Sequence, residues 1–231
     1  MFRKPVKAAL FDMDGLLIDS EAVYIAAMQA AARSLDLEMP LAFCHSMVGV
    51  PTRECNVMIQ DYYGAGFSLE TFRGVYSTNV RRLLEDRVPV KPGVVELLDF
   101  LEARGLPRAL ATSASRATAE HHLGRAGLLD RFTALATRDD VEHAKPAPDV
   151  YLEAARRLGV PAQNCIAFED SNIGLTAAHA AGTMAIMVPD ILPPTDEVRA
   201  KCLHIAPDLH AALRVLREAL PDRPGGAHRP W

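Results

Sequence analysis

Two aspartates stand directly after an apolar run near the N-terminus. In the segment LFDMDGLLIDSE the run ends at Phe11, and Asp12 and Asp14 follow with one residue between them and Gly15 behind. If the strand continues, alternate residues project on the same side, so the two carboxylates would be crowded together. Two like charges on one face need a counter-charge, which the rest of the sequence must supply.

Short apolar or β-branched runs alternate with longer helical patterns at the N-terminus and again from residue 89 onward. This alternation is typical of a parallel sheet with crossover helices. We therefore expect an α/β fold with a Rossmann-like parallel sheet. The expected strands are 6–11, 108–112, 132–137, 165–168, 184–188 and 203–206, and the expected helices are 94–105, 116–127, 149–159 and 171–182.

Residues 19–88 have a different pattern. They lack β-rich runs, and apolar residues recur at helical spacing, for example at Leu69, Phe72 and Tyr76. Ser68 is expected to begin the helix that carries these residues. The sequence thus predicts an α/β core made of residues 1–18 and 89–231, interrupted by a helical insert of residues 19–88.

Other polar residues directly follow the later strands. In open parallel sheets the ligand site lies beyond the carboxyl ends of the strands. The residues at these ends are acids, hydroxyls and one ammonium group: Asp12, Asp14, Thr112, Ser113, Lys145, Glu169 and Asp170. Their carboxylates would repel one another, and a hard divalent cation with oxygen ligands relieves that repulsion. We expect this cation to be Mg²⁺.

A metal ion alone would not require Thr112 or Lys145. A phosphate group would, because its oxygens accept hydrogen bonds from hydroxyl, backbone N–H and ammonium donors. The set predicts a site for a phosphomonoester, in which Asp12 attacks phosphorus in line and the metal neutralises the repulsion between carboxylate and phosphate. Asp14 can protonate the departing alcohol and then take a proton from the water that hydrolyses the aspartyl-phosphate.

These segments resemble the motifs of a known family, the haloacid dehalogenase-like (HAD) hydrolases. FDMDG is similar to the first motif, ALATSAS to the second, KPAPD to the third and FEDSNIG to the fourth. The resemblance implies that Asp12 is the nucleophile, and that Mg²⁺ is held by the Asp12 carboxylate, the Asp14 backbone carbonyl and Asp170, with Glu169 close by. It also implies that the insert is the small helical cap carried by one subclass of the family.

Within the family, FDMDGLLIDSE followed by Tyr24 resembles the sugar-phosphate and pseudouridine-5'-phosphate phosphatases. The related β-phosphoglucomutases have a histidine at the position that aligns with Tyr24, and this difference favours hydrolysis over mutase activity. Arg53, in GVPTRE, lies near the place where the mutase cap uses an arginine against a second phosphate. Tyr24 and Arg53 are therefore the candidate substrate-binding residues of the cap.

Three functional hypotheses fit these residues. The first is a magnesium-dependent phosphatase that acts on a small phosphorylated metabolite, such as a sugar phosphate or a nucleotide-like monophosphate. The second is a phosphomutase, which would return the phosphoryl group to sugar instead of water. The third is a phosphate-responsive binding module, because receiver domains also place acids, a hydroxyl and a lysine at strand ends; receivers, however, have no helical insert after the first strand.

Composition excludes several other classes. The formal net charge of −4 and the pI near 6.1 argue against a nucleic-acid-binding surface. No apolar run approaches the ~18 residues of a membrane span, and the N-terminus lacks a signal-peptide pattern, so we expect a cytoplasmic protein with no membrane partner. The pattern leaves the oligomeric state open.

Several polar residues are expected to be structural. The four cysteines are scattered, with no metal-binding spacing, and are expected to be reduced. Ser115 is expected to cap the helix that starts at residue 116. His121 and His122 have Glu120 and Arg125 nearby, and we expect both on a solvated helix face.

Overall fold

Six parallel strands form the central sheet. The computed structural model describes residues 2, 4–48, 50, 52–86 and 88–220. The order across the sheet is β3-β2-β1-β4-β5-β6, and every pair of neighbours is parallel. This confirms the expected α/β class, and each strand end lies within two residues of its expected position. The strands are β1 (Ala8–Phe11), β2 (Arg108–Ala111), β3 (Ala134–Ala136), β4 (Cys165–Glu169), β5 (Met184–Met187) and β6 (His204–Ile205).

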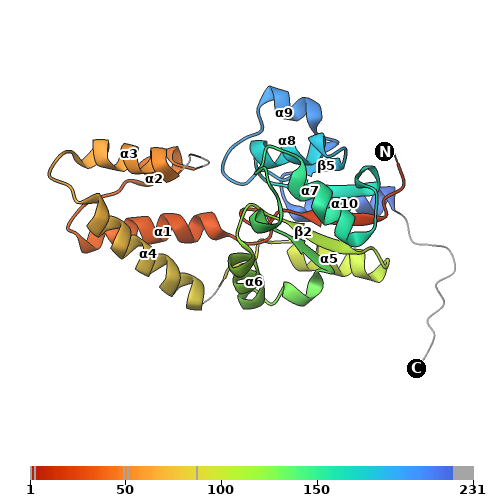
Figure 1. Ribbon diagram of the computed structural model, residues 1–231, viewed down its shortest axis with the longest axis horizontal. Helices are drawn as coiled ribbons and strands as arrows, with labels where there is room; N and C mark the ends of the chain where they lie inside the picture. The colour runs from red at the N-terminus through yellow and green to blue at the C-terminus, as the bar shows by residue number, and fades with distance from the viewer. Residues whose placement is uncertain (1, 3, 49, 51, 87, 221–231) are drawn as a thin grey trace.

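Helices cover both faces of the sheet (Figure 1). One face carries α5 (Val94–Ala103), α6 (Arg116–Arg125) and α10 (Leu209–Ala219), and the other carries α7 (Asp149–Leu158) and α8 (Asn172–Ala180). The short helix α9 (Asp196–Lys201) packs on α8. No helix in the described part of the chain is both long enough and apolar enough to cross a bilayer.

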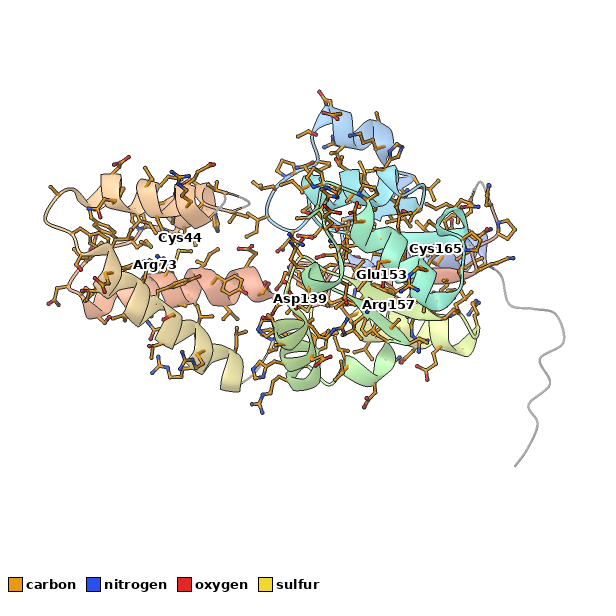
Figure 2. All side chains as sticks on the ribbon, viewed as in Figure 1. Cys44, Arg73, Asp139, Glu153, Arg157 and Cys165 are labelled. Carbon is orange, nitrogen blue, oxygen red and sulfur yellow. The ribbon has the colours of Figure 1, made fainter. Side chains whose placement is uncertain are left out.

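The segment between the first two strands is helical. It contains α1 (Ser20–Ser34), α2 (Leu41–Ser46), α3 (Thr52–Tyr63) and α4 (Leu69–Asp86), and it extends to one side of the sheet (Figure 1). These four helices, called the cap below, share their own apolar cluster, in which Cys44 and Phe72 are buried (Figure 2). The hydroxyl of Ser68 accepts a hydrogen bond from the backbone N–H of Thr71 at 3.3 Å, so Ser68 begins α4 as expected.

Two antiparallel segments join the cap to the core. The backbone N–H of Asp19 donates to the carbonyl of Pro89 at 2.9 Å, and that of Lys91 donates to the carbonyl of Leu17 at 3.0 Å. The ammonium group of Lys91 also bonds Asp190 at 2.5 Å. The chain therefore leaves and re-enters the core at one narrow junction.

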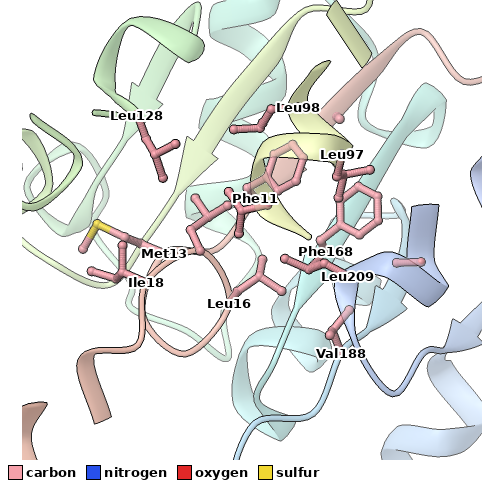
Figure 3. Packing of buried hydrophobic residues seen from close by; sticks show 14 of the residues in the cluster. Phe11, Met13, Leu16, Ile18, Leu97, Leu98, Leu128, Phe168, Val188 and Leu209 are labelled. Atoms are coloured by element: carbon pink, nitrogen blue, oxygen red, sulfur yellow. The ribbon is translucent and has the colours of Figure 1, made fainter. Parts of the chain in front are cut away.

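Alternate strand residues face opposite layers. Phe11 and Phe168 lie opposite each other on β1 and β4, and their rings stack at 4.9 Å between centroids (Figure 3). They pack against α5 and α10, whereas Leu10 on the other face packs against α7 and α8 with many alanines. Burial on both faces explains why these strands are continuous apolar runs in the sequence.

A polar network fixes the segment that follows β3. The carboxylate of Asp140 accepts hydrogen bonds from the hydroxyl of Thr137, from Arg116 on α6 and from Arg157 on α7, each at 2.7 Å. Arg157 also bonds Glu153 at 2.6 Å, and Figure 2 labels this pair on α7. The network therefore ties the start of the loop that carries Lys145 to two helices.

Replacing Asp140 by Asn should lower the free energy of unfolding by about 2 kcal/mol, because charged donors would lose their carboxylate. Burial alone would raise the pKa of Asp140, but hydrogen bonds from Thr137, Arg157 and Arg116 outweigh it and hold the pKa below 3.8. The stabilisation is thus complete above that value and is lost as the pH falls below it. Urea unfolding of Asp140→Asn should show a deficit at pH 7 that shrinks below pH ~4. The exposed Glu142→Gln is the control, and equal stability of the wild type and Asp140→Asn at pH 7 would contradict the network.

Candidate active site

Asp12 is the first residue after β1, at the centre of the sheet's carboxyl edge. Its backbone N–H still donates to the carbonyl of Phe168 at 3.1 Å, so its position is fixed by the neighbouring strand. The chain then turns at Gly15, which has a φ of 79°. A Cβ atom at Gly15 would lie 2.4 Å from Oδ2 of Asp170, so glycine lets the Asp170 carboxylate approach this turn.

Lys145 lies between two buried carboxylates. Its Nζ donates to Oδ1 of Asp12 at 2.5 Å and to Oε1 of Glu169 at 2.6 Å. Burial alone would lower the pKa of Lys145, but the two carboxylates outweigh it and raise the pKa above its ordinary value. The side chains of Lys145, Asp12 and Glu169 are 6%, 10% and 0% exposed. The ammonium group is therefore a permanent, desolvated counter-charge for these aspartate and glutamate side chains.

Glu169 accepts hydrogen bonds at both carboxylate oxygens. Besides Lys145, the phenol of Tyr151 donates to Oε1 at 2.5 Å, and the hydroxyl of Ser171 donates to Oε2 at 3.2 Å. Tyr151 was not identified from the sequence, because one tyrosine on the buried face of an amphipathic helix looks like any other core residue. A Cβ atom at Gly174 would lie only 1.9 Å from Oε1 of Glu169, so the first turn of α8 fits closely against this carboxylate.

Three carboxylates form an acidic cluster. Asp12, Glu169 and Asp170 each offer an oxygen within 4.8 Å of the others. Burial raises the pKa of Asp12 to about 7 against the lowering effect of Lys145, with Glu169 adding to the rise. Burial, together with Asp12 and Glu169, likewise raises the pKa of Asp170 well above its ordinary value. The three carboxylates carry more negative charge than Lys145 alone can neutralise. Such a set of hard oxygen donors fits a divalent cation.

The carboxyl group of Asp14 lies apart from this cluster. Its Oδ1 is buried without a hydrogen-bond partner. Burial raises the pKa of Asp14, and the nearby hydroxyl of Ser20 and ring of His122 partly offset that rise. Asp14 is therefore a half-buried carboxyl group beside the cluster, available for proton transfer.

The hydroxyl residues after β2 differ in exposure. Thr112 is 1% exposed, and its Oγ1 accepts a hydrogen bond from the backbone N–H of Ala114 at 3.1 Å. Ser113 is exposed. Ser115 accepts a hydrogen bond from the backbone N–H of Thr118 at 3.2 Å and caps α6, which confirms its structural role. Because β2 is adjacent to β1, Thr112 stands at the same sheet edge as Asp12.

The cap contains a cavity of about 860 Å³. Glu21 and Tyr24 of α1 line it, together with Arg73 of α4. Figure 2 labels Arg73. Burial raises the pKa of Tyr24, and nearby Asp14 contributes to that rise, so Tyr24 lies at the Asp14 end of the cap. Arg53 is exposed on α3, and it is not one of the described residues that line the cavity; positions 49 and 51 of its motif fall outside the described residues.

Comparison with known sequences and structures identifies the family. The sequence model of the haloacid dehalogenase-like hydrolases matches residues 9–188. The chain belongs to this family. This HAD protein is 34% identical to Protein CbbY of Rhodobacter capsulatus, across 95% of this chain and 99% of the relative. It is 33% identical to the phosphorylated carbohydrates phosphatase of Thermotoga maritima, across 77% and 82% of the two chains.

Solved structures agree with this assignment. A Thermotoga maritima structure provisionally described as a beta-phosphoglucomutase has a TM-score of 0.82 and 30% identity, with 93% of this chain and 100% of that chain covered. A HAD family hydrolase of Deinococcus radiodurans with bound phosphate and sodium has a TM-score of 0.80 and 27% identity, with 93% and 96% covered. The HAD core and the cap are thus both present in known relatives.

The prediction that His122 lies on a solvated helix face is wrong, because only 4% of the residue is exposed. The prediction rests on the charged residues near His122 in the sequence. Burial on a helix depends instead on the three- and four-residue spacing from other buried residues. Ala119 lies three residues before His122 on the same face of α6 and is also buried, and the adjacent Leu123 is buried as well. His121 is exposed, as expected.

Replacing Gly174 by Ala should displace the Glu169 carboxylate, because the added methyl group overlaps it. We expect a loss of about 1–3 kcal/mol in stability and of about a hundredfold in turnover, as Lys145 loses its anchor. Thermal unfolding and turnover with a phosphate ester measure the two effects. Gly124→Ala is the matched control, because a Cβ atom at this position of α6 meets nothing within 4 Å. Normal turnover by Gly174→Ala would show that Glu169 does not depend on this close fit.

Proposed function

We propose that this HAD protein is a magnesium-dependent phosphatase that hydrolyses a small phosphomonoester through an aspartyl-phosphate intermediate. The observation that carries the proposal is the buried ammonium of Lys145, which contacts Asp12 at 2.5 Å beside two further acids, Glu169 and Asp170. A buried nucleophilic carboxylate with a fixed cation at its side suits attack on an anionic phosphate.

The donor set supports a choice of metal ligands. Asp12 and Asp170 would hold Mg²⁺ together with the backbone carbonyl of Asp14. Glu169 lies in the same cluster, but Lys145, Tyr151 and Ser171 already occupy its oxygens, so its main role is to orient Lys145. When bound, the metal ion supplies positive charge against phosphate and carboxylate oxygens.

The protein's own residues then perform two displacements. Oδ of Asp12 forms a bond to phosphorus as the ester P–O bond breaks, and the departing oxygen takes a proton from Asp14. Asp14, now ionised, accepts a proton from the water that attacks the aspartyl-phosphate and releases inorganic phosphate. Lys145 and Thr112 bind the phosphate oxygens, with Ser113 at the rim of the same loop.

The cap is proposed as the specificity element. Its cavity of about 860 Å³, lined by Glu21, Tyr24 and Arg73, is large enough for a sugar or nucleoside group. Relatives are described as phosphorylated carbohydrates, fructose-1-phosphate and hexitol phosphatases. We therefore propose a sugar phosphate or nucleotide-like monophosphate as substrate. Residues 19–88 would form the cap and act as a lid over the core formed by residues 1–18 and 89–231. Arg53 is exposed on α3 and does not line this cavity, so we assign it no role in binding the substrate.

A phosphomutase is the second candidate, favoured by the likeness to the Thermotoga maritima structure. Burial raises the pKa of Tyr24, which keeps the phenol neutral at the position where the mutases have a histidine. A neutral phenol is a poorer proton acceptor than an imidazole. Formation of a sugar-phosphate isomer without net phosphate release would identify the mutase.

Phosphate release from a panel of sugar, nucleoside and two-carbon phosphates tests the phosphatase. With Mg²⁺, the wild type should hydrolyse at least one ester, and chelation of the metal should abolish the activity. Asp12→Asn should lose at least about a thousandfold in kcat, because the nucleophile is removed. Asp130→Asn, at an exposed position, is the control. If folded wild type releases no phosphate from any ester, the phosphatase is the wrong assignment.

A further inference from the structure

Three residues near the candidate active site each have a buried side-chain polar atom without a hydrogen-bond partner. Among the described residues, the buried side-chain atoms that lack a partner include Oδ1 of Asp14, Oγ of Ser20 and Nδ1 of His122. Ser20 is 0% and His122 is 4% exposed. A buried polar group without a partner costs about 1–3 kcal/mol, so three such groups in one place call for an explanation.

The three groups come from different parts of the fold. Asp14 lies in the turn after β1, Ser20 is the first residue of α1 in the cap, and His122 lies on α6 of the core. α6 packs against α4 near the point where the cap joins the core (Figure 1). Ser20 and His122 both lie close enough to the carboxyl group of Asp14 to lower its pKa, Ser20 through its hydroxyl group and His122 through its ring.

The ring of His122 is a polar group buried on α6. Its helix neighbours Ala119 and Leu123 belong to an apolar cluster, so leucine or valine would fill the position without burying a polar atom. Burial lowers the pKa of His122, which leaves the imidazole neutral at pH 7. A neutral imidazole can carry its single proton on Nδ1 and donate it to a carboxyl oxygen.

We propose that His122 is a positioning residue which, together with Ser20, holds the carboxyl group of Asp14 toward the departing ester oxygen. This role rests on the proposed phosphatase function. His122 touches neither the substrate nor phosphorus, and it acts only through Asp14. Proton transfer falls steeply when the acid is misaligned, so the orientation of Asp14 determines how well it protonates the leaving group.

The role predicts a dependence on the leaving group. In the first displacement the Asp12–phosphorus bond forms, the ester P–O bond breaks, and an alkoxide leaving group needs the proton of Asp14. A p-nitrophenolate ion is stable without that proton. Since kcat/KM reports only the steps up to this first departure, loss of the positioning residue should lower kcat/KM for a sugar phosphate and spare that for p-nitrophenyl phosphate.

The experiment compares kcat/KM for p-nitrophenyl phosphate with that for the best sugar phosphate of the panel. His122→Leu should lose about tenfold or more on the sugar phosphate relative to the aryl ester, a part of the ~10²–10⁴-fold that general acid catalysis supplies. His122→Asn keeps a neutral donor near Nδ1 and should restore most of that loss. Ser20→Ala should show the same leaving-group dependence as His122→Leu, and the exposed His121→Leu should match the wild type.

Equal losses on both esters, or the same loss in His122→Leu and His122→Asn, would overturn the positioning role. Thermal unfolding checks the fold of each variant, and His122→Leu should unfold at or above the wild-type temperature because it removes a buried unpaired polar atom. If His122→Leu fails to fold, Ser20→Ala and His122→Asn still decide the question. Wild-type protein that hydrolyses neither ester would instead overturn the proposed phosphatase function, and this role with it.

Discussion

The active site depends on one constraint, the burial of several carboxylates around a single ammonium group. Lys145 contacts Asp12 and Glu169, yet Asp170 adds a further carboxylate to the same cluster. A buried charge is tolerated only when it is paired, and here one cation faces three acids. A phosphate monoester would bring still more negative charge. A divalent cation would offset this negative charge, whereas Lys145 pairs directly with Asp12.

The parallel sheet brings these charges together. Phe11 and Phe168 are paired in register, so the chain segments that follow them, with Asp12 on one strand and Glu169 and Asp170 on the other, leave the sheet at the same level. The stacked rings of Phe11 and Phe168 are fully buried against the α5 and α10 layer. Lys145 arrives from a loop whose start is tied down by Asp140, and Tyr151 of α7 holds Glu169 from the opposite layer. Lys145 and Glu169 are thus each held in position by residues that lie outside the site.

Much of this arrangement was predictable from sequence, because strands and motifs are local. Apolar runs identified the strands, and the polar residues in the segments that follow them predicted that Asp12, Thr112, Lys145 and Asp170 are neighbours at one edge. Tyr151 escaped notice because its contact with Glu169 joins two distant segments, and no local pattern separates a hydrogen-bonded tyrosine from a packed one. His122 was misplaced because adjacent charges were given more weight than its spacing from Ala119 and Leu123. The cap cavity depends on how four helices pack, which periodicity alone does not specify.

The junction between cap and core gives Asp14 an unusual position. Its carboxyl group lies beside Ser20, which begins the first cap helix, and beside His122, which belongs to a core helix. Paired backbone segments around Leu17 and Lys91 form the connection on which the cap would rotate. Any such rotation would move the hydroxyl of Ser20 relative to Asp14 and leave the ring of His122 where it is. His122, which belongs to the core, would then keep Asp14 aligned through the catalytic cycle. Ser20, which belongs to the cap, would make the alignment of Asp14 depend on the position of the cap.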